Sequence, residues 1–146
     1  MERRYILCDA EKCTGCRICE FACSSGREGS FALELSRIRV VQSSPADTRS
    51  MACRFCRNAP CVSVCPRGAL SMDEENSIIR LDKGRCAGCG WCIESCPFGA
   101  IVLDWGTKTV VMCDLCLGLS QPRCIQFCPK NVLSIHGLDG DQAASR

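Results

Sequence analysis

Hydrophobic positions in this 146-residue chain fall into short runs rich in β-branched residues and bounded by turn-forming residues. This pattern is typical of short β-strands. The six runs lie at residues 4–7, 38–41, 77–81, 100–103, 109–112 and 132–135. Cysteine-rich segments separate them, each leaving room for one or two helical turns before its last cysteine. The chain is therefore predicted to repeat strand, cysteine loop, short helix and strand, which is an α+β fold.

Polar segments are expected to connect these elements. Residues 24–30 predict a loose loop, residues 43–50 a polar connector, and residues 137–146 a flexible tail. No apolar stretch reaches the roughly 18 residues typical of a membrane-spanning helix. No apolar segment or cleavage site follows the basic pair at residues 3–4, as a secretory signal would require. We therefore expect a cytoplasmic protein.

The composition is dominated by cysteine, with 17 Cys against five Phe, two Trp and one Tyr. Such a density indicates disulfides or metal sites, and disulfides need an oxidising compartment. A core this poor in large side chains would be marginal, so metal ligation is expected to supply much of the folding free energy. The metal-free chain should be largely disordered.

Sixteen of the cysteines form four runs of four. The runs are Cys13, Cys16, Cys19, Cys23; Cys53, Cys56, Cys61, Cys65; Cys86, Cys89, Cys92, Cys96; and Cys113, Cys116, Cys124, Cys128. The third run has the C-x2-C-x2-C-x3-C-P spacing of bacterial iron–sulfur proteins, whose fourth cysteine serves a neighbouring cluster. Gly88 and Gly90 let its backbone bend tightly. Sixteen thiolates are the number that four [4Fe–4S] clusters require.

Tetrahedral zinc is the alternative for repeated C-x2-C pairs. Two runs contain a strict triple C-x2-C-x2-C, which suits three corners of a cubane cluster better than a zinc site built from pairs. Cys8 is left over and is expected to be a small buried hydrophobe. His136 is interpreted as structural or surface, and Trp91 and Trp105 as covers that keep water from a cluster.

Charge and motifs exclude several function classes. The formal charge is +2, and four clusters of charge −2 would bring it to about −6. Basic residues beside the cysteines either form a solvated face or compensate this charge. Aromatic–basic interleaving, a nucleotide-binding glycine loop, a nucleophile–base pair and a paired-carboxylate motif are all absent from the sequence. Neither nucleic-acid binding nor catalysis by this chain itself is expected.

The order of the spacings resembles one family over residues 4–135. It is similar to the four-cluster electron-transfer subunits of molybdenum and tungsten oxidoreductases such as dimethyl sulfoxide reductase and formate dehydrogenase. Similar small members partner carbon monoxide dehydrogenase, hydrogenases, tungsten aldehyde oxidoreductase and benzoyl-CoA reductase. Ser24 departs from the pattern, because it stands where the other runs have proline.

The resemblance implies two nested bacterial-ferredoxin-like modules. The inner half would span 51–104, and the outer half would combine 1–42 with 105–136. The implied cluster ligands are Cys13, Cys16, Cys19 and Cys128; Cys23, Cys113, Cys116 and Cys124; Cys53, Cys56, Cys61 and Cys96; and Cys65, Cys86, Cys89 and Cys92. The spacings alone leave open a sequential arrangement that pairs run one with run two and run three with run four.

The resemblance also implies an electron-transfer subunit that relays single electrons between a catalytic subunit and another carrier. A tungsten or molybdenum aldehyde oxidoreductase type of partner is expected, with carbon monoxide dehydrogenase or hydrogenase as alternatives. Two other hypotheses remain: a free polyferredoxin carrier, and a non-redox zinc or iron-storage protein.

Overall fold

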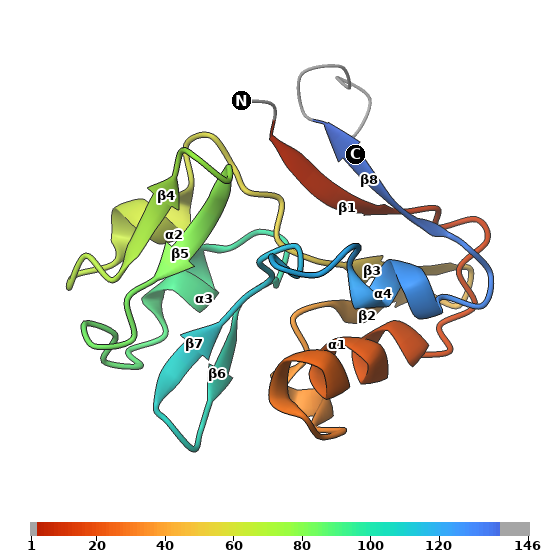
Figure 1. The fold of residues 1–146 in the computed structure, drawn as a ribbon, viewed down its shortest axis with the longest axis horizontal. Helices are drawn as coiled ribbons and strands as arrows, with labels where there is room; N and C mark the ends of the chain where they lie inside the picture. Colours follow the sequence, from red (N-terminus) through yellow and green to blue (C-terminus); the bar gives the residue numbers. More distant parts are fainter. Residues whose placement is uncertain (1–2, 138–146) are drawn as a thin grey trace.

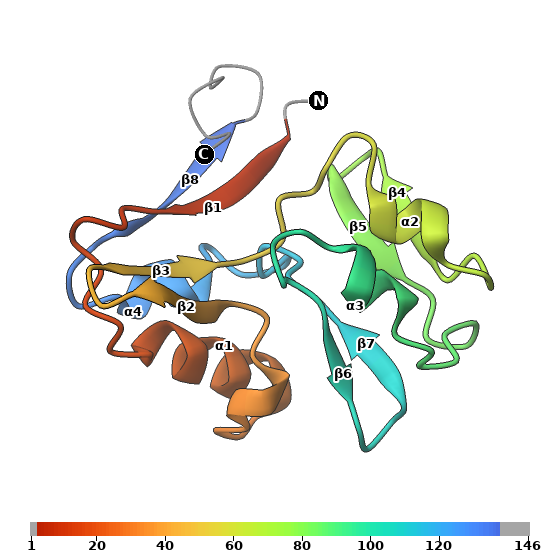
Figure 2. The ribbon, with the colours of Figure 1, turned by 180° about the vertical axis from the view of Figure 1, so that it is seen from behind.

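The fold consists of short helices and strands in two lobes, seen in a computed structural model that describes residues 3–137 (Figure 1). The helices are α1 (Ile18–Glu28), α2 (Pro60–Val64), α3 (Trp91–Ser95) and α4 (Arg123–Phe127), with a 3₁₀ turn, η1 (Leu33–Leu35). The strands are β1 (Arg4–Cys8), β2 (Arg39–Ser44), β3 (Asp47–Met51), β4 (Leu70–Asp73), β5 (Ile78–Leu81), β6 (Val102–Asp104), β7 (Thr109–Val111) and β8 (Leu133–Gly137). One lobe holds α2, α3 and β4 to β7, and the other holds α1, α4, β1 to β3 and β8 (Figures 1 and 2).

All strand pairs are antiparallel and two-stranded within the described chain. Three of them, β2–β3, β4–β5 and β6–β7, are hairpins. The fourth joins β1 to β8 in a register that sets Arg4 opposite Gly137 and Cys8 opposite Leu133. Helix α1 packs against α4, and α2 packs against α3. Segments that are distant in sequence therefore hold each lobe together. Among the described residues, no helix is long and apolar enough to cross a membrane.

Helix α1 is longer than expected, and the predicted loop at 24–30 is wrong for most of its length. Helices α2, α3 and α4 stop at cysteines in extended conformation, because each of these cysteines precedes a proline. Ser24 replaces that proline in the first run, so α1 continues for 11 residues. It ends at Gly29, whose φ of 70° is the left-handed cap usual for glycine.

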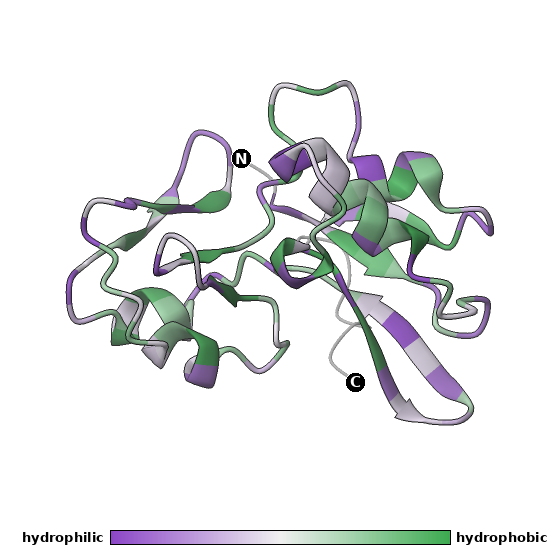
Figure 3. Cartoon of the chain, turned by 90° about the horizontal axis from the view of Figure 1, so that it is seen from below, coloured by the Kyte–Doolittle hydropathy of each residue, from purple (hydrophilic) through white to green (hydrophobic). Residues whose placement is uncertain are grey.

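Two strands escaped prediction because their sequences lack the β-branched pattern. The connector predicted at 43–50 contains the end of β2 and most of β3, in which hydrophilic residues dominate (Figure 3). Backbone pairing forms this hairpin, while most of β2 faces solvent. Strand β4 pairs with β5, and the Asp73 carboxylate accepts N–H bonds from Glu75 and Asn76 in the turn between them. Gly137 of the predicted tail belongs to β8, and the rest of that tail lies outside the described residues.

The core contains few large side chains. Tyr5, Ile38, Phe55 and Val110 are its largest fully buried apolar residues. Eight cysteines are buried as well, and most of the rest are half-buried against the same cluster of core residues. The cysteine side chains thus occupy much of the space that apolar side chains fill in an ordinary domain.

One glycine in the third cysteine run permits a close approach between two segments. Gly88 has a φ of 68°, and a Cβ at this position would lie closer than 3.0 Å to the carbonyl oxygen of Lys108. The turn between β6 and β7 therefore packs directly against the loop that carries Cys86 and Cys89.

Replacing Gly88 by alanine should lower the melting temperature of the anaerobically purified protein. A left-handed alanine costs about 1 kcal/mol, and the backbone clash adds to it. Gly99→Ala is the matched control, because Gly99 has a similar φ of 61° but no neighbour within 4 Å of the added Cβ. We expect Gly88→Ala to melt at least 3 °C below Gly99→Ala, following the usual scaling of roughly 2–4 °C per kcal/mol. Equal melting temperatures would contradict the packing described.

Candidate metal centres

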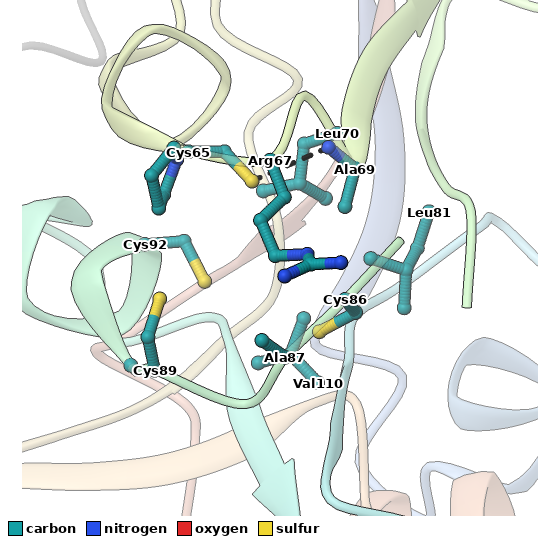
Figure 4. Close-up of a pocket in the computed structure, with 12 residues that line it drawn as sticks. Cys65, Arg67, Ala69, Leu70, Leu81, Cys86, Ala87, Cys89, Cys92 and Val110 are labelled. Carbon is teal, nitrogen blue, oxygen red and sulfur yellow. Dashed lines mark hydrogen bonds between the residues drawn. The ribbon is translucent and has the colours of Figure 1, made fainter. Parts of the chain in front are cut away.

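The hollow around Cys89 is formed by the end of α2, the loop after β5, and α3. Cys65, Cys86, Cys89 and Cys92 line it, and about 350 Å³ of space, part of it open to solvent, lies between its walls. Figure 4 shows these four sulfurs pointing towards one space, with the Arg67 side chain lying across it. We call it the Cys89 hollow.

Two similar hollows lie in the other lobe. The Cys16 hollow is lined by Cys13, Cys16, Cys19 and Cys128. The Cys23 hollow is lined by Cys23, Cys113, Cys116 and Cys124. Each therefore combines cysteines from the first and the fourth run.

The remaining four of the sixteen cysteines in the runs form the Cys53 group: Cys53, Cys56, Cys61 and Cys96. Burial, and then the negative charge of the three neighbouring thiolates, raises the pKa of Cys53 to about 12. The pKa values of Cys56 and Cys61 are also raised, mainly by burial and next by the negative charge of Cys96. The four thiols therefore lie near one another, and they come from the second and third runs.

Burial raises the pKa of eight of the sixteen thiols and makes them hard to ionise in the metal-free protein. It raises the pKa of Cys19 and that of Cys92 to about 11. The pKa values of Cys113 and Cys124 also rise strongly with burial. The pKa of Cys65 is lowered instead. Its slight burial would raise the pKa, but hydrogen bonds from backbone N–H groups, chiefly that of Ala69, outweigh this effect. A metal must therefore displace protons from the buried thiols.

Each run places a left-handed residue just before its second cysteine. Gly15, Phe55, Gly88 and Leu115 have φ values of 71°, 49°, 68° and 57°. At Phe55 and Leu115 this turn directs the backbone N–H to the sulfur two residues earlier, with N···S distances of 3.4 and 3.3 Å. A left-handed conformation is unfavourable for Phe and Leu. The N–H bond to sulfur offsets part of that cost, and the sequence did not reveal this role.

Other hydrogen-bond donors also face the sulfurs. The backbone N–H of Arg37 lies 3.2 Å from the sulfur of Cys23, and that of Ala69 lies 3.3 Å from the sulfur of Cys65. In the Cys16 hollow the Ser50 hydroxyl is 3.4 Å from the sulfur of Cys19. Ser50 is a site residue that sequence reasoning missed, because it lies in the unpredicted strand β3.

The Cys23 hollow also contains two arginines from outside the cysteine runs. Arg27 and Arg37 both form ion pairs with Asp114. The Nε atoms of both arginines are nevertheless buried and have no hydrogen-bond partner among the described atoms. Buried donors without partners are costly. A bound group rich in sulfur acceptors would fit beside them.

The arrangement of donors fits a multi-iron cluster better than a single ion. Within residues 3–137, no three Cys, His, Asp or Glu side chains are placed to hold one metal ion. Zinc would need four sulfurs at about 2.3 Å from one centre. The thiols instead line three shared hollows, with four sulfurs around each. Soft thiolate ligands around a wider space suit an iron–sulfur cluster.

The other residues singled out from the sequence lie near these centres but do not all play the expected part. Cys8 is the last residue of β1 and is half-buried. Burial is the main cause that raises the pKa of its thiol, and the nearby Cys13 adds to it. Hydrogen bonds from Ser50 lower this pKa but do not cancel the rise. His136 lies in β8 opposite Tyr5. The expectation that the tryptophans shield a cluster is wrong, because Trp91 and Trp105 are 55% and 72% exposed. The Lys108 ammonium lies over the Trp105 ring instead.

Comparisons with known proteins support an iron–sulfur role. The sequence model of the 4Fe-4S dicluster domain matches residues 46–137. The polyferredoxin-like subunit of aliphatic sulfonate oxidoreductase from Pyrococcus furiosus is 40% identical, covering 87% of this chain and 72% of that protein. The thiosulfate reductase electron transfer subunit PhsB of Salmonella typhi is 37% identical, covering 95% and 79%. The electron transport protein HydN of Escherichia coli is 35% identical, covering 89% and 86%.

The fold also matches solved structures. A chain of the active-site complex BamBC of benzoyl-CoA reductase superimposes with a TM-score of 0.56 at 24% identity, covering 94% of this chain and 81% of that chain. The fold is thus a small ferredoxin-like one with short strands and helices. The relatives PhsB and HydN are named for electron transfer and not for catalysis. This chain therefore belongs to the 4Fe-4S dicluster domain family, as an iron–sulfur electron-transfer subunit of oxidoreductase complexes.

Proposed function

We propose that the chain binds four [4Fe–4S] clusters and relays single electrons between a catalytic oxidoreductase subunit and another redox carrier or subunit. The observation that supports this most directly is the grouping of twelve thiols around three hollows, four around each. The three cysteine-lined hollows and the Cys53 group would each hold one cluster. The ligands would be Cys65, Cys86, Cys89 and Cys92; Cys13, Cys16, Cys19 and Cys128; Cys23, Cys113, Cys116 and Cys124; and Cys53, Cys56, Cys61 and Cys96.

Two nested ferredoxin-like modules account for these sets. Residues 51–104 would form the inner module and residues 1–42 with 105–136 the outer one, except that β7 (Thr109–Val111) pairs with β6 in the lobe of α2 and α3 and so belongs with the inner module. The contacts between α2 and α3, and between α1 and α4, favour this division over the sequential one. The pairing of β1 with β8 favours it as well, because it brings both ends of the described chain into one module.

A bound [4Fe–4S] cluster supplies the chemistry, since it takes up and releases one electron at a time. The protein contributes thiolate ligands, backbone N–H donors to sulfur, and a water-poor environment. All four thiols of the Cys23 hollow are buried. The Cys16 and Cys89 hollows each have one exposed thiol.

The two exposed thiols suggest where electrons enter and leave. Cys16 and Cys89 are the exposed members of the sixteen, and they belong to hollows in different lobes. A redox partner could approach the edge of a cluster at either place. The more enclosed centres would then connect these two ends.

The catalytic partner would be a tungsten or molybdenum enzyme of the aldehyde oxidoreductase type. The relatives support a dedicated subunit, because two of them are named as subunits of a sulfonate oxidoreductase and a thiosulfate reductase. Carbon monoxide dehydrogenase or hydrogenase would be the alternative partners. A free polyferredoxin is the alternative function.

Elemental analysis of the protein isolated anaerobically from its own host, with whatever stays bound, tests this proposal. We expect about 16 iron atoms per chain together with stoichiometric tungsten or molybdenum from a companion chain. Nickel would indicate the carbon monoxide dehydrogenase or hydrogenase type. The same iron without a second metal or companion chain would make the protein a free carrier. About four zinc and no iron would reject the proposal.

Paired alanine variants test the nested ligand sets. Cys65→Ala with Cys92→Ala removes two ligands of one proposed centre, so the loss should be about 4 iron atoms per chain. The double variant Cys65→Ala with Cys19→Ala removes one ligand from each of two proposed centres, so the loss should be about 8 iron atoms per chain. The sequential arrangement, in which Cys65 joins the first run, predicts the reverse order. Iron and protein assays on the anaerobically purified variants decide between the two.

A further inference from the structure

Ser50 places a hydroxyl group against one candidate ligand of the Cys16 hollow. Its Oγ lies 3.4 Å from the sulfur of Cys19, and the residue is only 5% exposed. Strand β3, which carries it, is paired with β2 and packs against β1. The hydroxyl is therefore held at the wall of the hollow, away from competing water.

The chemistry of the pair determines which atom donates. A cysteine sulfur that is bound to iron has lost its proton. The hydrogen bond must then run from the Ser50 hydroxyl to the sulfur of Cys19. Bonds to a charged acceptor are stronger than those between neutral groups.

Such a bond acts differently on the two oxidation states of a cluster. Reduction adds negative charge, part of which spreads onto the thiolate sulfurs. A donor aimed at one of these sulfurs stabilises the reduced state more than the oxidised state. Hydrogen bonds to sulfur are accordingly among the factors that set cluster potentials.

We propose that Ser50 is a positioning residue that raises the reduction potential of the centre in the Cys16 hollow, through a hydrogen bond from its hydroxyl to Cys19. This inference rests on the proposed ligand set Cys13, Cys16, Cys19 and Cys128. The Ser36 hydroxyl also lies beside a sulfur, that of Cys23, but it donates its hydrogen bond to the Ile38 carbonyl oxygen. The sulfurs of Cys53 and Cys113 accept their hydrogen bonds from backbone N–H groups, which a side-chain substitution leaves in place.

The test is a redox titration of the anaerobically purified protein, followed by electron paramagnetic resonance, with iron measured on the same samples. In Ser50→Ala one reduction wave should move to lower potential while the iron content stays at the wild-type value. We expect the ratio of reduced to oxidised centre at fixed potential to fall about threefold, which is ~28 mV for a one-electron couple. Ser50→Thr keeps the hydroxyl and should retain the wild-type wave.

Ser24→Ala is the matched control. Ser24 is also fully buried in the same lobe, but its hydroxyl donates to the Phe21 carbonyl oxygen and not to a sulfur. Its titration should therefore follow the wild type. A shift in Ser24→Ala as large as that in Ser50→Ala would overturn the inference, because any loss of a buried hydroxyl would then suffice.

Two further outcomes separate this inference from the proposed function. Wild-type protein without iron–sulfur signals would reject the proposed function itself. If the Ser50→Ala variant contains the wild-type amount of iron and none of its reduction potentials has shifted, only the role of Ser50 is overturned. Should Ser50→Ala fail to load, the isosteric pair Ser50→Val and Ser50→Thr replaces it, and the threefold difference is expected between these two. Loss of iron in Ala and Val but not Thr would make the hydroxyl an assembly requirement and overturn the inference.

Discussion

The convergence of cysteine thiols on shared spaces is the constraint around which this small structure is built. Few large apolar side chains are available, and Tyr5, Ile38, Phe55 and Val110 are the main ones fully buried. Much of the remaining interior consists of thiols whose pKa values burial raises, such as Cys53 and Cys92. Buried groups of this kind are poor substitutes for a hydrocarbon core unless a metal engages them. Folding and cofactor binding should accordingly be coupled in this protein.

The backbone adapts to that constraint in the same way in all four cysteine runs. A left-handed residue before the second cysteine turns the chain sharply, whether the residue is Gly15, Gly88, Phe55 or Leu115. Where a proline follows the fourth cysteine, the preceding helix ends at once. The Phe and Leu positions carry local strain. Their backbone N–H groups reach sulfur in return, so the strained geometry and the candidate ligand belong to one local motif.

Long-range contacts bring the runs together. The pairing of β1 with β8 and the packing of α1 on α4 join the beginning and end of the described chain. Asp114 ties the segment after β7 to Arg27 of α1 and to Arg37, beside the Cys23 hollow. These contacts place half-buried cations next to thiols that would become anionic on binding a metal. They also leave Cys16 and Cys89 exposed in different lobes, which suits a protein that must meet more than one redox partner.

The sequence by itself determined the cofactor class and the repeating local unit, because cysteine spacing and proline act over a few residues. Six of the eight strands in the described part of the chain could be located from it, and the replacement of proline by Ser24 accounts for the length of α1. The polar strand β3 could not be predicted, because its backbone pairing leaves no hydrophobic period. The position of Ser50, the exposure of Trp91 and Trp105, and the half-buried arginines beside the Cys23 hollow were decided only by the tertiary structure. Such features depend on which distant segments come into contact, and the spacing of residues along the chain does not determine those contacts.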